Sequence, residues 1–130
     1  AVQAHNLTPR ARIHHISTRG ADPVFMLTGP IPATQYALEK TGLSIDDIDA
    51  YEVNEAFAAV TMAFMHEMGV GHDVVNVNGG ACALGHPVGA TGARIMTTLI
   101  YALQARGKKR GVAALCIGGG EATALAVELI

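Results

Sequence analysis

The chain ends in the stretch GVAALCIGGGEATALAVELI, residues 111–130. Two apolar runs of strand length lie within it, Gly111 to Ile117 and Ala122 to Ile130. Only residues 118–121 separate them, and so short a connection suits a hairpin but cannot hold a crossover helix. We therefore expect an antiparallel pair of strands at the end of the fold.

Upstream of this hairpin, strand-like runs alternate with helical runs. The expected strands are Arg12 to Ser17, Ile48 to Val53 and Val74 to Val77, and the expected helices are Pro32 to Lys40, Glu55 to Met68 and Ala93 to Arg106. Such alternation predicts parallel strands joined by right-handed crossovers. With the hairpin added, the sequence predicts an α/β fold with a mixed five-stranded sheet, helices on both faces and a terminal antiparallel hairpin.

Length, charge and hydropathy exclude several classes of protein. At 130 residues with 50% hydrophobic residues, we expect one domain over residues 1–130, and no apolar run approaches the ~20 residues of a membrane span. A net charge of −2 and a single basic cluster, residues 108–110, argue against a nucleic-acid surface. Two cysteines without paired spacing favour a reducing compartment, the cytoplasm or an organelle.

A thiol and an imidazole each lie beside glycines at the end of a predicted strand. Cys116 precedes three glycines, whose backbone N–H groups are left open to a ligand, and His86 lies in the turn Gly85-His86-Pro87. A thiol, an imidazole and free amides together are typical of acyl-transfer chemistry. The alternatives are a small buried hydrophobic residue for Cys116 and a loop histidine bound to a carbonyl for His86.

Asn54 follows the predicted strand that ends at Val53. Because ligands bind at the carboxyl ends of parallel strands, we expect Asn54 and the His86 loop at the same edge of the sheet. The alternative is that Asn54 caps the next helix and that Glu55 interacts with the dipole of that helix. Cys82 is surrounded by alanines and is expected to pack rather than react. The other histidines lack the spacing of metal ligands, so no metal site is expected.

Three blocks resemble, in the same order, the C-terminal signature motifs of the thiolase family. They are Asn54-Glu55-Ala56-Phe57, Gly79-Gly80 followed by Gly85-His86-Pro87, and Cys116-Ile117-Gly118-Gly119-Gly120. The resemblance runs from about Pro9 to the end of the chain. It implies the C-terminal half of a thiolase-like fold and acyl transfer between coenzyme A thioesters, by cleavage of 3-ketoacyl-CoA or the reverse Claisen condensation. It also implies no permanently bound cofactor, since coenzyme A thioesters are substrates.

The resemblance also implies a role for each matching residue. His86 would activate an acyl-accepting cysteine and donate to one oxyanion, helped by a water held on Asn54. Cys116 would act as acid and base at the substrate α-carbon. The backbone N–H of Gly118 would contribute to a second oxyanion hole. The motifs assign no residue to the binding of coenzyme A itself.

One part of the family pattern is missing from these residues. Thiolases carry the acyl-accepting cysteine and the coenzyme A loop in an N-terminal half, and nothing here matches it; Cys82 lies where the family has no nucleophile. We therefore expect the chain to be inactive alone, with acyl-CoA, CoA, an N-terminal thiolase domain and a homo-oligomeric assembly as its partners. The alternatives are a non-catalytic thiolase-like acyl-binding or assembly module, and a ketoacyl synthase.

Overall fold

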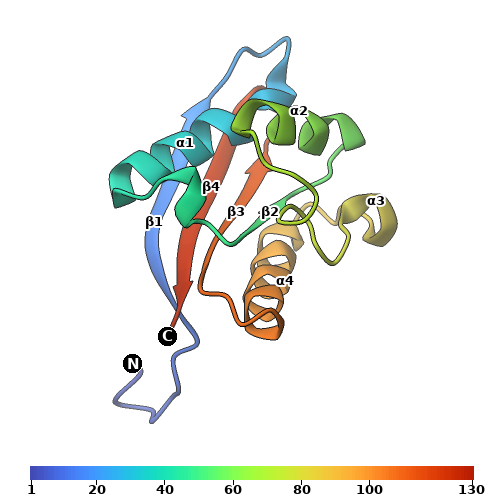
Figure 1. Cartoon of the computed structure of the whole chain (residues 1–130). Coiled ribbons are helices and arrows are strands. Elements are labelled where there is room, and N and C mark those ends of the chain that lie inside the picture. The colour runs from blue at the N-terminus through green and yellow to red at the C-terminus, as the bar shows by residue number, and fades with distance from the viewer.

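The computed structural model describes residues 1–130 and contains one mixed sheet with the strand order β1-β4-β3-β2 (Figure 1). Its strands are β1 (Ala11–Gly20), β2 (Ala50–Val53), β3 (Arg110–Cys116) and β4 (Glu121–Leu129). β3 and β4 form the predicted antiparallel hairpin, β1 pairs antiparallel with β4, and β2 pairs parallel with β3. The predicted mixed sheet and terminal hairpin are confirmed.

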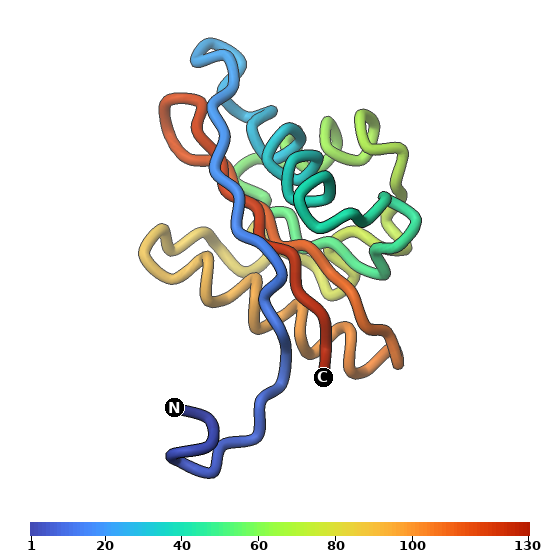
Figure 2. Tube along the Cα trace, turned by 90° about the vertical axis from the view of Figure 1, so that its left-hand side faces the viewer, coloured from blue at the N-terminus to red at the C-terminus, as the bar shows by residue number.

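Helices cover both faces of the sheet, as predicted. They are α1 (Pro30–Thr41), α2 (Ala58–Met68), α3 (Ala81–Leu84) and α4 (Thr91–Ala105), with single 3-10 turns η1 (Met26–Thr28) and η2 (Ile45–Asp47). In Figure 2 the strands run between α1 and α2 on one side and α4 on the other. None of these helices combines the length and the apolar character needed to cross a bilayer.

The sheet has four strands rather than the predicted five, because the run Val74 to Val77 forms only one bridge, between Val75 and Tyr51. Asn76 interrupts it with a left-handed backbone conformation, φ 48°. The Asn76 side chain continues the pairing instead: Oδ1 accepts from the Val53 N–H and Nδ2 donates to the Val53 carbonyl, both at 2.8 Å. A side-chain amide thus takes the place of a strand neighbour.

The alternation of side chains along β2 decides what reaches each face of the sheet. Tyr51 and Val53 are buried in the larger core beneath α1 and α2. Ala50 belongs to the smaller core under α4, so Glu52 and Asn54 point to the α4 side as well. This register brings two polar side chains under the first turns of α4.

Part of the sheet face on which α4 packs remains uncovered. α4 packs mainly on β2 and β3, and beyond it Ile13 and Ile16 of β1 are each 58% exposed. A shallow apolar groove of about 230 Å³ lies between α4 and β1, and its walls include Ile16, Met96 and Leu125. This groove is an apolar surface of the chain that its own helices do not cover.

Candidate active site

The segments that follow β2 and β3 meet at one edge of the sheet. Val53 pairs with Ala114, and the Asn54 N–H donates to the Ala114 carbonyl at 2.9 Å, so Asn54 lies beside the end of β3 that carries Cys116. The loop between α3 and α4 brings His86 to the same place, with His86 Nδ1 3.4 Å from Asn54 Nδ2. Residues separated widely in the sequence are therefore neighbours.

Two adjoining hollows open at this edge and share His86, Cys116, Ile117 and Gly118 as lining residues. The first, of about 230 Å³, is closed by Met26, Leu27, Ala56 and Phe57. The second, of about 290 Å³, is closed by Val88, Thr91, Gly92 and Leu115. The structure thus brings the imidazole, the thiol and the glycine backbone together in a mainly apolar pocket, whereas Asn54, only 1% exposed, lies buried against His86.

His86 is oriented by Thr91, the first residue of α4. The Thr91 hydroxyl donates to the Pro87 carbonyl at 3.1 Å, and His86 Nδ1 lies 2.7 Å from Thr91 Oγ1. When the hydroxyl gives its one proton to the carbonyl, it accepts at the shorter contact, which corresponds to the His86 tautomer with its proton on Nδ1. His86 Nε2 has no partner within the chain and, in this tautomer, carries the lone pair of a base.

Asn54 is held from its other side by Arg94 of α4. Arg94 Nη2 donates to Asn54 Oδ1 at 3.1 Å, which turns Asn54 Nδ2 toward His86. The alternative role as a helix cap is wrong, because Phe57 is the N-cap residue of α2 and no side chain caps that helix. Asn54 is therefore free to hydrogen-bond within the site.

Glu55 ties the loop after β2 to the segment that leads to His86. Its carboxylate accepts from Asn76 Nδ2 at 3.0 Å and from the Cys82 N–H at the start of α3 at 2.9 Å. Burial opposes ionisation, but these hydrogen bonds outweigh it and lower the pKa of Glu55. A Cβ at Gly80 would lie 2.5 Å from the Glu55 carboxyl carbon, so this contact requires glycine there. The expected interaction of Glu55 with the dipole of α2 is wrong, because α2 begins only at Ala58.

Cys116 ends β3 and is partly buried. Burial raises the pKa of its thiol, contrary to the lowering that an adjacent imidazole and open amides would cause. The resting group is thus a protonated thiol, which can deliver a proton. Just beyond it, Gly118 lines both hollows, and its N–H has no hydrogen-bond partner within the chain.

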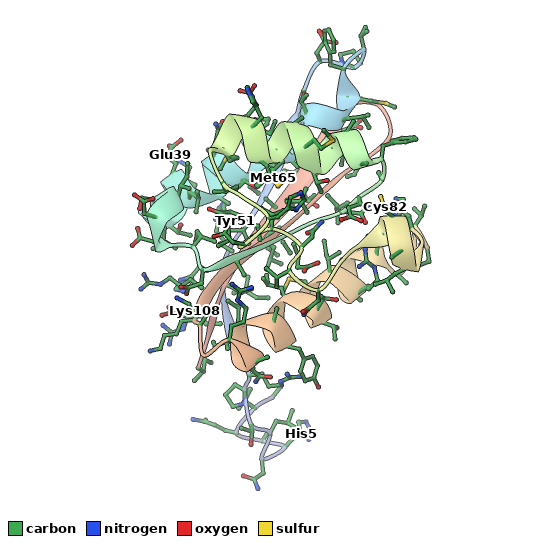
Figure 3. The ribbon with its side chains drawn as sticks, turned by 45° about the vertical axis from the view of Figure 1, so that its right-hand side comes forward. His5, Glu39, Tyr51, Met65, Cys82 and Lys108 are labelled. Atoms are coloured by element: carbon green, nitrogen blue, oxygen red, sulfur yellow. The ribbon has the colours of Figure 1, made fainter.

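Cys82 lies apart from this pocket, but the prediction that it packs is wrong, because its side chain is exposed. It is exposed on α3 (Figure 3). It is not among the residues that line either hollow. Desolvation and the neighbouring Glu55 carboxylate raise the pKa of its thiol, which disfavours the nucleophilic thiolate.

Three residues of the site have no counterpart in the sequence-based prediction: Asn76, Thr91 and Arg94. Asn76 falls within a predicted strand, and the predicted helix begins at Ala93, which leaves Thr91 outside it. The spacing of Thr91 five residues after His86 and three before Arg94 is a local signal, because it allows one helical turn to face the histidine loop. The sequence does not show which partners these side chains find.

Known proteins resemble the chain in sequence. The model of a family described as thiolase, C-terminal domain, matches residues 7–129. A steroid 3-ketoacyl-CoA thiolase of Mycobacterium tuberculosis is 60% identical over 98% of this chain, and an acetyl-CoA acetyltransferase of Paracoccus denitrificans is 55% identical over 94% of it. In both cases the match covers 31% of the relative, so the chain spans about a third of the length of these proteins.

Solved structures resemble it in fold. The crystal structure of a Bacillus anthracis acetyl-CoA acetyltransferase matches with a TM-score of 0.94, and that of human mitochondrial 3-ketoacyl-CoA thiolase with 0.96. Each is 46% identical to this chain, and each match covers 99% of this chain and 33% of the other. The fold expected from the three sequence motifs is confirmed.

Proposed function

This chain belongs to the thiolase family as its C-terminal domain, and from that premise we propose that it forms one side of an active site for acyl transfer between coenzyme A thioesters. Its reaction is the cleavage of a 3-ketoacyl-CoA by CoA, or the reverse Claisen condensation. The observation that carries the proposal is the shared pocket of His86, Cys116 and the free N–H of Gly118. The acyl-accepting cysteine comes from a polypeptide equivalent to the remaining two thirds of the relatives.

In the cleavage direction, His86 Nε2 takes the proton of the acyl-accepting cysteine, whose sulfur attacks the 3-keto carbon. The bond between C2 and C3 breaks, and its electron pair forms the enolate of acetyl-CoA. The enolate oxygen is stabilised by His86 and by a water that Asn54 holds. The Cys116 thiol donates its proton to the α-carbon, and acetyl-CoA leaves.

The second half of the reaction returns every group to its starting state. The Cys116 thiolate takes the proton of the incoming CoA thiol, and the CoA sulfur attacks the acyl-cysteine carbonyl. The N–H of Gly118 stabilises the resulting oxyanion. Collapse of this intermediate releases the shortened acyl-CoA and the cysteine thiolate, which regains the proton held by His86.

A fusion of this chain to the N-terminal part of a relative tests the proposed acyl transfer. We would join this chain to the N-terminal two thirds of the Paracoccus denitrificans relative and measure cleavage of acetoacetyl-CoA by CoA. The fusion is expected to be active and the chain alone inactive. His86→Ala and Cys116→Ala in the fusion should each lower kcat by at least about 100-fold, the usual contribution of a positioned acid or base.

Cys82→Ala is the matched control, because it removes a thiol that lies outside the pocket, and it should leave kcat unchanged. A folded fusion without activity, or one that keeps its activity after loss of His86, would contradict the proposal and favour a non-catalytic assembly module. Activity with carrier-protein thioesters in place of CoA would indicate a synthase.

Assembly and location also belong to this proposal. We infer that the complete protein forms a homo-oligomer, for which the uncovered apolar groove between α4 and β1 supplies surface, and that it works in the cytoplasm, where the thiols Cys82 and Cys116 stay reduced. Light scattering of the fusion measures its oligomeric state. A fluorescent tag on the complete protein shows its location in the cell.

A further inference from the structure

The first turn of α4 touches both polar side chains of the site. Thr91 contacts His86, and Arg94, three residues later and on the same side of the helix, contacts Asn54. We propose that Arg94 is a positioning residue that fixes the orientation of the Asn54 carboxamide, so that the NH₂ group of Asn54 and not its oxygen faces His86. The catalytic consequence of this inference rests on the proposed function, whereas the orientation itself does not.

A carboxamide can adopt two orientations that differ by an exchange of oxygen and nitrogen, and its neighbours decide between them. In the tautomer that donates from Nδ1 to Thr91, the His86 N–H would by itself attract the oxygen of Asn54. A guanidinium has donors only, and Arg94 Nη2 lies 3.1 Å from Asn54 Oδ1. Arg94 therefore holds the oxygen away from the imidazole and leaves the NH₂ hydrogens available to the site.

The Arg94 side chain does little else for the fold. Its bond to Asn54 is the only hydrogen bond that the guanidinium makes, and Nε and Nη1 are buried without partners. A residue whose purpose was structural would be expected to satisfy these groups, since buried donors without partners are costly. The burial of a guanidinium for one bond to a site residue points to a positioning role.

Glu52 is a second buried polar side chain next to this guanidinium in the same core. It is 2% exposed, it lies two residues before Asn54 on the same face of β2, and its Oε1 has no hydrogen-bond partner. The charge of Arg94 acts on both Glu52 and Glu55. Neither carboxylate forms a direct ion pair with Arg94, so the guanidinium is left to bond to Asn54.

Nitrogen NMR of the full 130-residue chain tests the orientation without any assay of activity. In the wild-type chain the two Nδ2 hydrogens of Asn54 should exchange slowly with water. In Arg94→Met the amide is released, and its exchange should quicken about tenfold or more, with a change in the ¹⁵N shifts of the His86 ring. Arg106→Met is the matched control, since Arg106 lies at the other end of α4 and bonds only to the Asp73 carbonyl; it should leave both signals unchanged.

Arg94→Met also leaves Glu52 without its counter-charge and could fail to fold for that reason. The double variant Arg94→Met with Glu52→Gln removes both buried charges, and it should show the same changes at Asn54 and His86. If either folded variant keeps the wild-type exchange of the Asn54 amide and the wild-type ¹⁵N shifts of His86, Arg94 does not position Asn54 and the inference is overturned.

The active fusion gives a second measurement. Arg94→Met should lower kcat by about 10- to 100-fold and leave KM little changed, because a misplaced donor weakens the transition state more than the bound substrate. An unchanged kcat beside an altered Asn54 signal would overturn the catalytic part alone. An inactive parent fusion would count against the proposed function, and the NMR result would stand independently of it.

Discussion

Gly118 and Gly120 follow the same cysteine, but the fold needs glycine at only one of them. Gly120 has a left-handed conformation, φ 102°, and a Cβ there would lie 2.7 Å from the Ala21 carbonyl oxygen. A Cβ at Gly118 would meet no other atom of the chain within 4 Å, and the backbone there is not left-handed. The space beside Gly118 belongs to the pocket, so the fold itself does not require glycine there.

Alanine substitutions should separate these two requirements. Gly120→Ala should lower the free energy of unfolding by about 1–3 kcal/mol because of backbone strain and the carbonyl contact. Gly118→Ala should change it by no more than about 0.5 kcal/mol, yet abolish activity in the fusion by filling the pocket. Urea denaturation of the chain and the cleavage assay measure the two effects. Equal destabilisation by both variants would contradict this assignment.

Glu52 makes stability depend on pH. Burial raises its pKa from 4.5 to about 7, although the positive charge of Arg94 opposes the shift. A raised pKa means that the folded chain binds this proton more tightly than the unfolded chain does. Its contribution to stability is therefore fully present below about pH 4.5 and is lost as the pH rises through about 7.

Glu52→Gln should remove this dependence. The wild-type chain is expected to lose up to roughly 3 kcal/mol of unfolding free energy from this group between about pH 5 and pH 8, and the variant should lose much less. Glu39→Gln is the control, since the Glu39 side chain is 69% exposed. Urea denaturation at a series of pH values measures the unfolding free energy. Parallel plots of this free energy against pH for the wild type and Glu52→Gln would show that Glu52 does not titrate in this range.

At the scale of elements, the first turn of α4 organises the site. This helix packs on β2 and β3, so its first turn lies beside the ends of the strands that carry Asn54 and Cys116. Thr91 is only 1% exposed, and its hydroxyl bridges the Pro87 carbonyl and the His86 ring. A helix that supports the sheet therefore also orients the ring of the histidine.

Thr91→Val keeps the shape of this side chain and removes the hydroxyl. The loss of a buried hydrogen bond should cost about 1–3 kcal/mol of unfolding free energy, and the His86 ¹⁵N signals should shift toward a mixture of tautomers. Thr97→Val is a close match, because the Thr97 hydroxyl also donates to the carbonyl four residues earlier but is exposed. Thr97→Val should change neither quantity, and unchanged His86 signals in Thr91→Val would refute the role of the hydroxyl.

At the scale of the whole molecule, the two faces of the sheet differ in how completely they are covered. α1 and α2 cover one face, and α4 covers the other (Figures 1 and 2). α4 leaves the β1 side of its face open, where Ile13 and Ile16 are exposed. An uncovered apolar groove of this kind marks a binding surface. In the proposed function it supplies surface for the homo-oligomer.

Fluorescence of a hydrophobic dye measures this surface. The chain alone should bind 1-anilinonaphthalene-8-sulfonate, and Ile13→Thr with Ile16→Thr should reduce the signal while changing stability by no more than about 1 kcal/mol, since threonine also favours strands. Val24→Thr is the control, because Val24 is 84% exposed outside the sheet. Unchanged dye binding in the double variant would place the apolar surface elsewhere.

The sequence by itself determined the hairpin, the alternation of strands and helices, and the three motifs that identify the family. Each of these depends on local information: the period of apolar residues, the length of a connection, and glycines at fixed spacing. The tertiary structure alone decided that Asn76 replaces a fifth strand, that Thr91 orients His86 and that Arg94 orients Asn54. These contacts join residues far apart in the chain or polar side chains whose directions are set only when α4 packs on the sheet, so local spacing does not show which partners they find.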